Sequence, residues 1–120
     1  DREAYARWLD ASALEDVPLF AFTVEPGPGD SATSYSRMFA PAIGIFEDPA
    51  TGSAAGPLGC YLVAHGVVPE EKAGTIVNLQ GVRMGRPSVI HVAIAAAAGA
   101  ITSVRVGGDA VLAGEGTLYL

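Results

Sequence analysis

Residues 47–55, with the sequence EDPATGSAA, place two carboxylates, two hydroxyls and a glycine directly before an apolar stretch. Gly52 beside Ser53 allows the backbone to approach a ligand closely, because glycine carries no side chain. The helix expected from Ser53 onward presents unpaired N–H groups and the positive end of its dipole to an anion. A carboxylate such as Asp48 next to an anion-binding turn indicates proton-transfer chemistry on a negatively charged ligand.

A purely structural interpretation of the same residues stays open. Ser53 or Thr51 at the start of a helix is typical of an N-cap, which contributes about 1 kcal/mol of helix stability and no catalysis. Asp48 in a turn before a helix commonly accepts hydrogen bonds from nearby backbone N–H groups, here those of Ala50 or Thr51. A cap needs only one such residue, so the surplus of polar groups in this segment favours ligand binding.

Other kinds of site lack their residues. A nucleophile elbow needs glycine two positions before and two positions after the serine, and Thr51 and Ala55 stand there instead. Cys60, His65 and His91 lack the close spacing of a metal site, so no metal is expected. The glycines that follow match neither a dinucleotide fingerprint nor a P-loop, so no cofactor is expected.

The composition indicates one folded domain of 120 residues. Half of the residues are hydrophobic and 17% are charged, which argues against a disordered chain. A net charge of −6 with scattered Arg and Lys argues against a nucleic-acid partner. No apolar run is long enough to cross a bilayer and no secretory signal opens the sequence, so no membrane partner is expected. The single Cys60 agrees with a reducing, cytoplasmic location.

Sequence periodicity places the polar segment between a strand and a helix. Helical spacing predicts a short helix over 2–9, and aromatic and β-branched residues predict strands over 18–24 and 35–40. Trp8 and Phe20 are expected to pack in the core or at an interface. These elements lead through a loop into residues 47–55.

An apolar helix is expected from Ser53 to the stop at Gly66, and Gly56 and Gly59 would let strands approach it closely. Short strands separated by glycine-rich turns are expected at 74–79, 88–95, 101–106, 110–113 and 117–120. One apolar helix with these strands predicts an α+β fold. In that fold a curved antiparallel sheet, or barrel, wraps around one central apolar helix.

Five segments carry a family resemblance through their order and spacing, and they are residues 37–41, 47–54, 80–81, 84–88 and 106–110. Together they resemble the phenazine-biosynthesis PhzF-like isomerase family. The resemblance runs from about Pro18 onward, and Asp-Pro-Ala-Thr-Gly-Ser is among the most specific signatures of that family. Its fold is similar to that of diaminopimelate epimerase, with two related lobes that hold the substrate in the cleft between them.

The resemblance implies that residues 1–120 form a single domain, the C-terminal lobe of a PhzF-like protein. It implies that Asp48 and Ser53 are catalytic residues facing the cleft, and that Thr51, Gly52 and Ser53 bind the substrate carboxylate. In the family a glutamate of the other lobe removes and returns a carbon-bound proton without any cofactor. No residue of this sequence matches that glutamate, and Glu47 is not expected to replace it.

The function implied is therefore half of a cofactor-independent isomerase that shifts a proton and a double bond on a small cyclic carboxylate. The expected partners are an N-terminal lobe, from the same gene or a separate chain, and a second copy of the two-lobed unit in a dimer. The isolated chain is expected to be inactive. The alternative is a non-catalytic module that binds a small carboxylate or mediates assembly.

Overall fold

The structure is a computed structural model that describes residues 2–12, 17–25, 27, 31–97 and 99–119. Within these residues the helices are α1 (Arg2–Ser12) and α2 (Gly52–Ala64), with short 3-10 helices η1 (Pro41–Ile43), η2 (Glu70–Thr75) and η3 (Val82–Met84). The strands are β1 (Leu19–Thr23), β2 (Ser34–Ala40), β3 (Ile45–Asp48), β4 (Ile76–Gln80), β5 (Ser88–Ala97) and β6 (Ala100–Gly107). None of the described helices is both long and apolar enough to pass through a bilayer.

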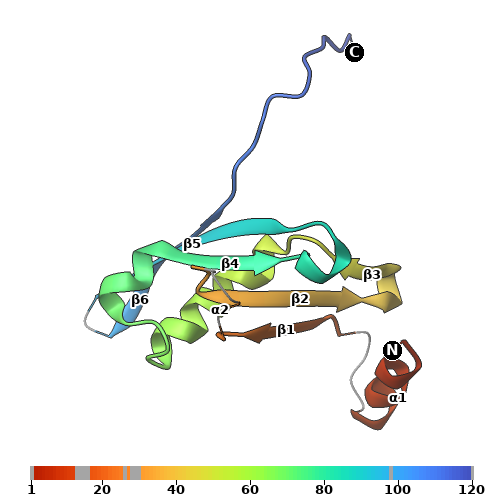
Figure 1. Cartoon of the computed structure of the whole chain (residues 1–120), viewed down its shortest axis with the longest axis horizontal. Coiled ribbons are helices and arrows are strands. Elements are labelled where there is room, and N and C mark those ends of the chain that lie inside the picture. Colours follow the sequence, from red (N-terminus) through yellow and green to blue (C-terminus); the bar gives the residue numbers. More distant parts are fainter. Residues whose placement is uncertain (1, 13–16, 26, 28–30, 98, 120) are drawn as a thin grey trace.

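All six strands belong to one curled sheet in the order β1-β2-β4-β5-β6, with β3 paired to the far end of β2 (Figure 1). The fold is therefore mixed α and β, as predicted. The predicted antiparallel pairing is confirmed for β1 with β2, β2 with β3, β4 with β5 and β5 with β6. It is wrong for β2 and β4, which run parallel, with Ser34 opposite Asn78 and Ser36 opposite Gln80. The chain between these strands includes α2, and such a crossover connection returns the chain in the same direction.

Glycines on one side of α2 bring it close to β5 and β6. A Cβ atom on Gly59 would lie 2.6 Å from Cγ1 of Val92, and one on Gly56 would lie 3.2 Å from Cγ1 of Val104. The prediction that these glycines allow close approach of strands is confirmed. The buried residues of the core cluster are Ala55, Leu58, Leu62, Val68, Ala73, Ile76, Ile90, Val92 and Ile94.

The opposite side of α2 is open in the described part of the chain. Ser53, Pro57 and Tyr61 are exposed along it. The ring of Tyr61 packs edge to face with the ring of Phe22 from β1, with 5.7 Å between the ring centroids, and it also packs against the ring of His65, at 4.3 Å. The sheet thus covers one side of this helix, and its complete enclosure as a central helix remains a prediction.

The C-terminal segment extends away from the sheet (Figure 1). The predicted strands at 110–113 and 117–120 are wrong for its described residues, which end at Tyr119 and carry no strand. Val111 and Tyr119 are each 90% exposed, so their side chains pack against nothing in the described chain. A strand needs a neighbour to pair its backbone groups, and β propensity alone does not supply one.

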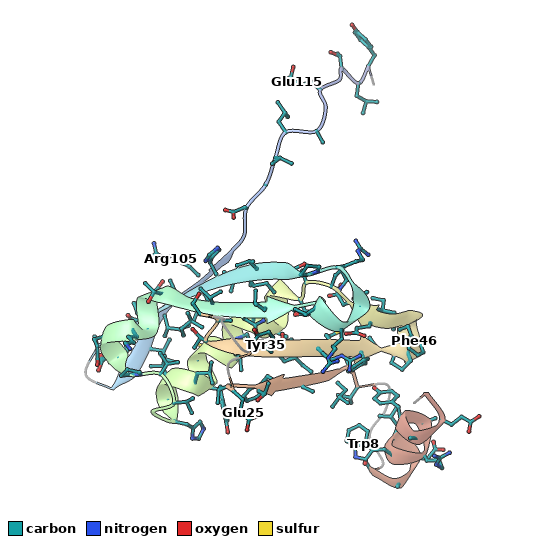
Figure 2. All side chains as sticks on the ribbon, viewed as in Figure 1. Trp8, Glu25, Tyr35, Phe46, Arg105 and Glu115 are labelled. Atoms are coloured by element: carbon teal, nitrogen blue, oxygen red, sulfur yellow. The ribbon has the colours of Figure 1, made fainter. Side chains whose placement is uncertain are left out.

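The two aromatic residues expected in the core or at an interface differ in burial. Phe20 packs against the core cluster and is partly buried, as predicted. Trp8 of α1 is 44% exposed. It lines a hollow with Tyr5 and Phe46, on the outer side of the sheet, and Figure 2 shows α1 below the end of the sheet that carries Phe46.

Candidate functional site

Asp48 ends β3, and Thr51 precedes the first residue of α2. Pairing with Met38 of β2 fixes the position of Asp48 in the sheet. The carbonyl of Thr51 accepts hydrogen bonds from the N–H groups of Ala54 and Ala55, at 3.2 and 3.0 Å, which starts the helix. The intervening turn contains Pro49, and its fixed φ and missing N–H end the strand.

The side chains of Asp48 and Thr51 contact each other directly. The Thr51 hydroxyl donates to Oδ2 of Asp48 at 2.6 Å, and Thr51 is only 8% exposed. Thr51 occupies the N-cap position but makes no capping hydrogen bond with its side chain. The alternative structural interpretation, in which Asp48 accepts from the N–H of Ala50 or Thr51, is wrong for the described residues. The Thr51 N–H donates to Oε1 of Gln80, at 3.2 Å, and the Ala50 N–H makes no hydrogen bond with a described residue.

Gln80 is the residue of this site that the sequence interpretation missed. Its side chain is fully buried at the end of β4. Its Nε2 donates to the carbonyl of Asp48 at 2.7 Å and to Oγ1 of Thr51 at 2.8 Å. The available signal was the Gln80-Gly81 pair, which belongs to the segments of the family resemblance but was given no role.

The first N–H groups of α2 have no hydrogen-bond acceptor within the helix, as at any helix start. Those of Gly52 and Ser53 have no hydrogen-bond partner among the residues that the structure describes. Ser53 is exposed, and its hydroxyl makes no hydrogen bond within the same set of residues. This helix end can therefore donate hydrogen bonds to an anion.

A hollow of about 620 Å³ lies beside this helix end. It is lined by Gly52 and Ala50 of the motif, by Pro87 and Ser88 before and at the start of β5, and by residues 106–109 at the end of β6. Three segments that are distant in sequence, and that all belong to the family resemblance, therefore meet at one place. Of the predicted site residues Gly52 lines this hollow, Thr51 and Ser53 are its neighbours in the chain, and Asp48 ends the strand before the same turn. The catalytic and binding roles of these residues remain predictions.

Glu47 is directed to a different partner. The Arg37 guanidinium donates from Nε and Nη2 to the two carboxylate oxygens of Glu47, at 2.9 and 2.8 Å. This pair of hydrogen bonds lowers the pKa of the Glu47 carboxyl from its ordinary value and raises the pKa of Arg37. A carboxylate held in its ionised form by an arginine is a weak base, which agrees with leaving Glu47 out of the predicted catalytic set.

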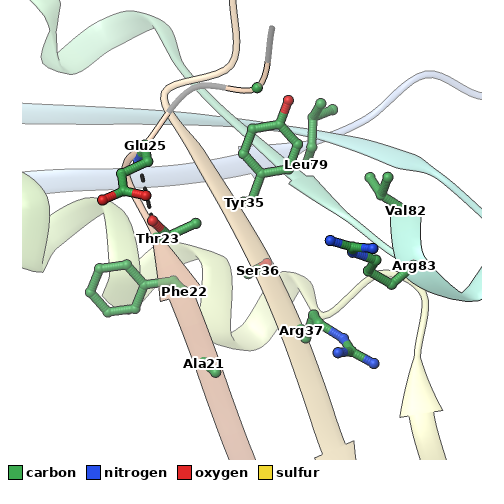
Figure 3. Close-up of a pocket in the computed structure, with 11 residues that line it drawn as sticks. Ala21, Phe22, Thr23, Glu25, Tyr35, Ser36, Arg37, Leu79, Val82 and Arg83 are labelled. Atoms are coloured by element: carbon green, nitrogen blue, oxygen red, sulfur yellow. Dashed lines mark hydrogen bonds between the residues drawn. The ribbon is translucent and has the colours of Figure 1, made fainter. Parts of the chain in front are cut away.

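A second hollow of about 520 Å³ opens on the outer face of the sheet (Figure 3). Tyr35 and Leu79 line it, and they alternate along their strands with buried residues that face α2. Arg37 and Arg83 both reach its edge, as the close-up shows. None of the predicted site residues lines this hollow, so the sheet separates it from the motif.

Comparison with known proteins places residues 9–116 in the family described as phenazine biosynthesis-like protein, PhzC-PhzF. The trans-2,3-dihydro-3-hydroxyanthranilate isomerase of Pseudomonas chlororaphis is 48% identical over 85 residues, which cover 71% of this chain and 30% of that protein. The Pseudomonas aeruginosa protein of the same name is 41% identical over 111 residues, 92% of this chain and 38% of that protein. "Uncharacterized isomerase YddE" of Escherichia coli is 38% identical over 97 residues, 78% of this chain and 31% of that protein. The chain thus spans about a third of the length of these relatives.

Proposed function

The chain belongs to the phenazine biosynthesis-like PhzC-PhzF family, whose curated relatives are named isomerases, and from this premise we propose that it forms the C-terminal half of such an isomerase. In this proposal the enzyme moves a proton and a double bond on a small cyclic carboxylate. The general base belongs to an N-terminal lobe. The chain itself contributes the residues that bind and orient the substrate, and no cofactor takes part.

The observation that carries the proposal is the meeting of three distant segments around the start of α2. There the unpaired N–H groups of Gly52 and Ser53, and the Ser53 hydroxyl, are available to hold a carboxylate. The carboxyl of Asp48 lies in the adjacent turn and can hold or pass a proton. The Thr51 hydroxyl already donates to Asp48, so Thr51 contributes to binding by shaping the turn.

Removing a proton from carbon needs a site without bulk water, in which fixed donors meet the developing negative charge. The hollow beside Gly52 is open in this chain, so a second lobe has to close it. The open side of α2, where Tyr61 is 49% exposed, offers apolar surface for that enclosure. We therefore propose that residues 1–120 form one lobe, and that the two-lobed unit pairs as a dimer in the cytoplasm.

Co-expression with the N-terminal part of the Pseudomonas aeruginosa relative tests this proposal. The assembled pair should turn over trans-2,3-dihydro-3-hydroxyanthranilate, and Asp48→Asn should lower kcat by about 100-fold or more. Glu47→Gln is the matched control, because it changes the neighbouring carboxylate, whose partner is Arg37. Its kcat should stay within about 3-fold of the unchanged pair. A correctly assembled pair without turnover would end the isomerase proposal.

The alternative function is a non-catalytic module that binds a small carboxylate. The free N–H groups at the start of α2 favour it, since an anion site of this kind needs no general base. Calorimetry with anthranilate as the probe separates the two functions. Heat that disappears in Ser53→Ala, in an assembly that shows no turnover, would support the binding module.

A further inference from the structure

The orientation of the Gln80 side-chain amide is fixed by two backbone groups. The N–H of Thr51 can only donate, so the atom that faces it, at 3.2 Å, is Oε1. The carbonyl of Asp48 can only accept, so the atom that faces it, at 2.7 Å, is Nε2. One buried amide therefore binds both ends of the turn from Asp48 to Thr51.

This orientation also fixes the direction of the Thr51 hydroxyl. The second proton of Gln80 Nε2 is donated to Oγ1 of Thr51 at 2.8 Å, so the hydroxyl uses its own proton in another hydrogen bond. That proton goes to Oδ2 of Asp48 at 2.6 Å. No described residue donates a hydrogen bond to the other carboxylate oxygen, Oδ1. Oδ2 is thus occupied from inside the protein, and Oδ1 is available.

The same hydrogen-bond direction continues through the buried polar residues of β2 and β4. The hydroxyl of Ser34 donates to Oδ1 of Asn78 at 2.9 Å, and Nδ2 of Asn78 donates to Oγ of Ser36 at 2.8 Å. Ser36 then donates to Oε1 of Gln80 at 3.3 Å. These bonds join β2 to β4, and among the described residues they reach the turn through the Gln80 amide.

Gly81 brings the end of β4 against the back of the same turn. Its φ is +75°, and a Cβ atom there would lie 2.2 Å from the carbonyl oxygen of Arg86 and 3.0 Å from that of Pro49. No residue with a side chain fits this position without moving the backbone. The backbone next to Gln80 is therefore held in a fixed position against the turn.

We propose that Gln80 is a positioning residue, which acts through Thr51 to hold Asp48 in one orientation and leaves Oδ1 as the oxygen presented to the substrate. The presentation of Oδ1 to the substrate rests on the proposed isomerase function. The positioning of Asp48 does not, because it concerns only contacts within this chain. Gln80 touches no substrate in this proposal.

The decisive variant is Gln80→Glu, with Asn78→Asp as its matched control. Both convert a fully buried amide of β4 into a carboxyl, on the same face of the sheet. Only Gln80→Glu removes the donors to Asp48 and Thr51. A second pair, Gln80→Met and Asn78→Leu, removes the polar groups without adding a charge, and serves if the first pair fails to fold.

Proton couplings between Hα and the two Hβ atoms of Asp48, measured by NMR on the full chain, report its rotamer directly. A single rotamer is expected in the unchanged chain and in the Asn78 variants, and averaged couplings are expected in the Gln80 variants. In Gln80→Met the amide proton of Thr51 should also exchange at least about 10-fold faster, because it loses its acceptor. A single Asp48 rotamer in both Gln80 variants, or equal averaging in the Asn78 variants, would overturn the proposal.

Kinetics of the assembled two-lobed enzyme supply the second readout. Gln80→Glu should lower kcat by about 10- to 100-fold with KM within about 3-fold, since a misplaced catalytic group affects the chemical step more than binding. Asn78→Asp should keep kcat within about 3-fold. An assembled enzyme that shows no turnover before any substitution would refute the isomerase function, and the Asp48 couplings would still decide whether Gln80 positions Asp48.

Discussion

The inner face of the curled sheet has two halves that are equally buried and chemically opposite. On β5 the residues that face α2 are apolar, and on β2 and β4 most of those at the same depth are polar. The apolar set is Ile90, Val92 and Ile94, and the polar set is Ser34, Ser36, Asn78 and Gln80. The first set packs against α2 on the side of its glycines. The members of the second set bond to one another, and Gln80 alone among them bonds to the turn that precedes α2.

The difference between the two halves shows how one helix can be both held against the sheet and fixed in orientation. Apolar packing is non-directional and supplies stability in proportion to the area buried. A buried polar group contributes little net stability when it is satisfied and costs much when it is not, but its hydrogen bonds have direction. In the described part of the chain no buried side-chain nitrogen or oxygen lacks a partner. The polar half therefore orients the motif, and the apolar half holds the helix that carries it.

The largest loss of stability is expected in the apolar half, from Leu62→Ala. Leu62 is fully buried in α2. Truncation should lower the free energy of unfolding by about 3 to 5 kcal/mol, because transfer energy is lost and a cavity remains. Urea denaturation measures it, with Val111→Ala as the control, since Val111 is 90% exposed and its truncation should change stability by less than about 0.5 kcal/mol. Similar midpoints for the two variants would contradict this assignment of the core.

A smaller loss of stability is expected in the polar half, from Thr51→Val. The substitution keeps the shape of the side chain, removes the donor to Asp48 and leaves one N–H of Gln80 without its acceptor. The cost should be about 1 to 3 kcal/mol, below that of Leu62→Ala. The loss of activity in the assembled enzyme should nevertheless be larger than for any apolar variant that still folds. Thr51→Ser, which keeps the hydroxyl, should retain most of the stability and most of the activity. A Thr51→Val enzyme with full kcat would show that Thr51 does not belong to the site.

The apolar half of this comparison could be predicted from the sequence, because its signals are local. The spacing of apolar residues gave the position of α2, and Gly56 and Gly59 within it gave the close approach of strands. The polar half could not be predicted in the same way. Gln80 meets Thr51 only because β2 and β4 run parallel, and nothing in the residues near Gln80 encodes that pairing.

Two further errors have the same origin in long-range pairing. β3 was not predicted as a strand, since it is short and polar at its end, and it exists through its pairing with β2. Residues 110–113 and 117–120 have strand-like composition, but the described residues among them have no neighbouring strand to pair with. Asp48 and Ser53 were identified through their motif, and the contact between Asp48 and Thr51 came from the structure alone.

The smallest effect is expected where a polar contact lies on the solvated face, at Arg37 and Glu47. The guanidinium holds the pKa of Glu47 below its ordinary value of 4.5, so folding favours the ionised carboxylate. The ion pair therefore stabilises the fold fully at pH above about 4.5, and this contribution is lost as the pH falls through the lowered folded-state pKa. Because the Arg37 side chain is 47% exposed, Glu47→Gln should cost no more than about 1 kcal/mol at neutral pH.

Denaturation of the unchanged chain and of Glu47→Gln at several pH values measures this contribution as a difference in the free energy of unfolding. The difference should shrink toward zero in acid, and it should also shrink at high salt, which screens a solvated pair. Glu25→Gln is the control, since Glu25 is exposed and forms no ion pair with any described residue. A Glu47→Gln loss as large as that of Thr51→Val would mean that a hydrogen bond on the open face is as important for stability as one in the buried polar half. The Arg37–Glu47 pair and the buried polar half would then differ only in the direction of their hydrogen bonds, because burial would no longer account for a difference in stability.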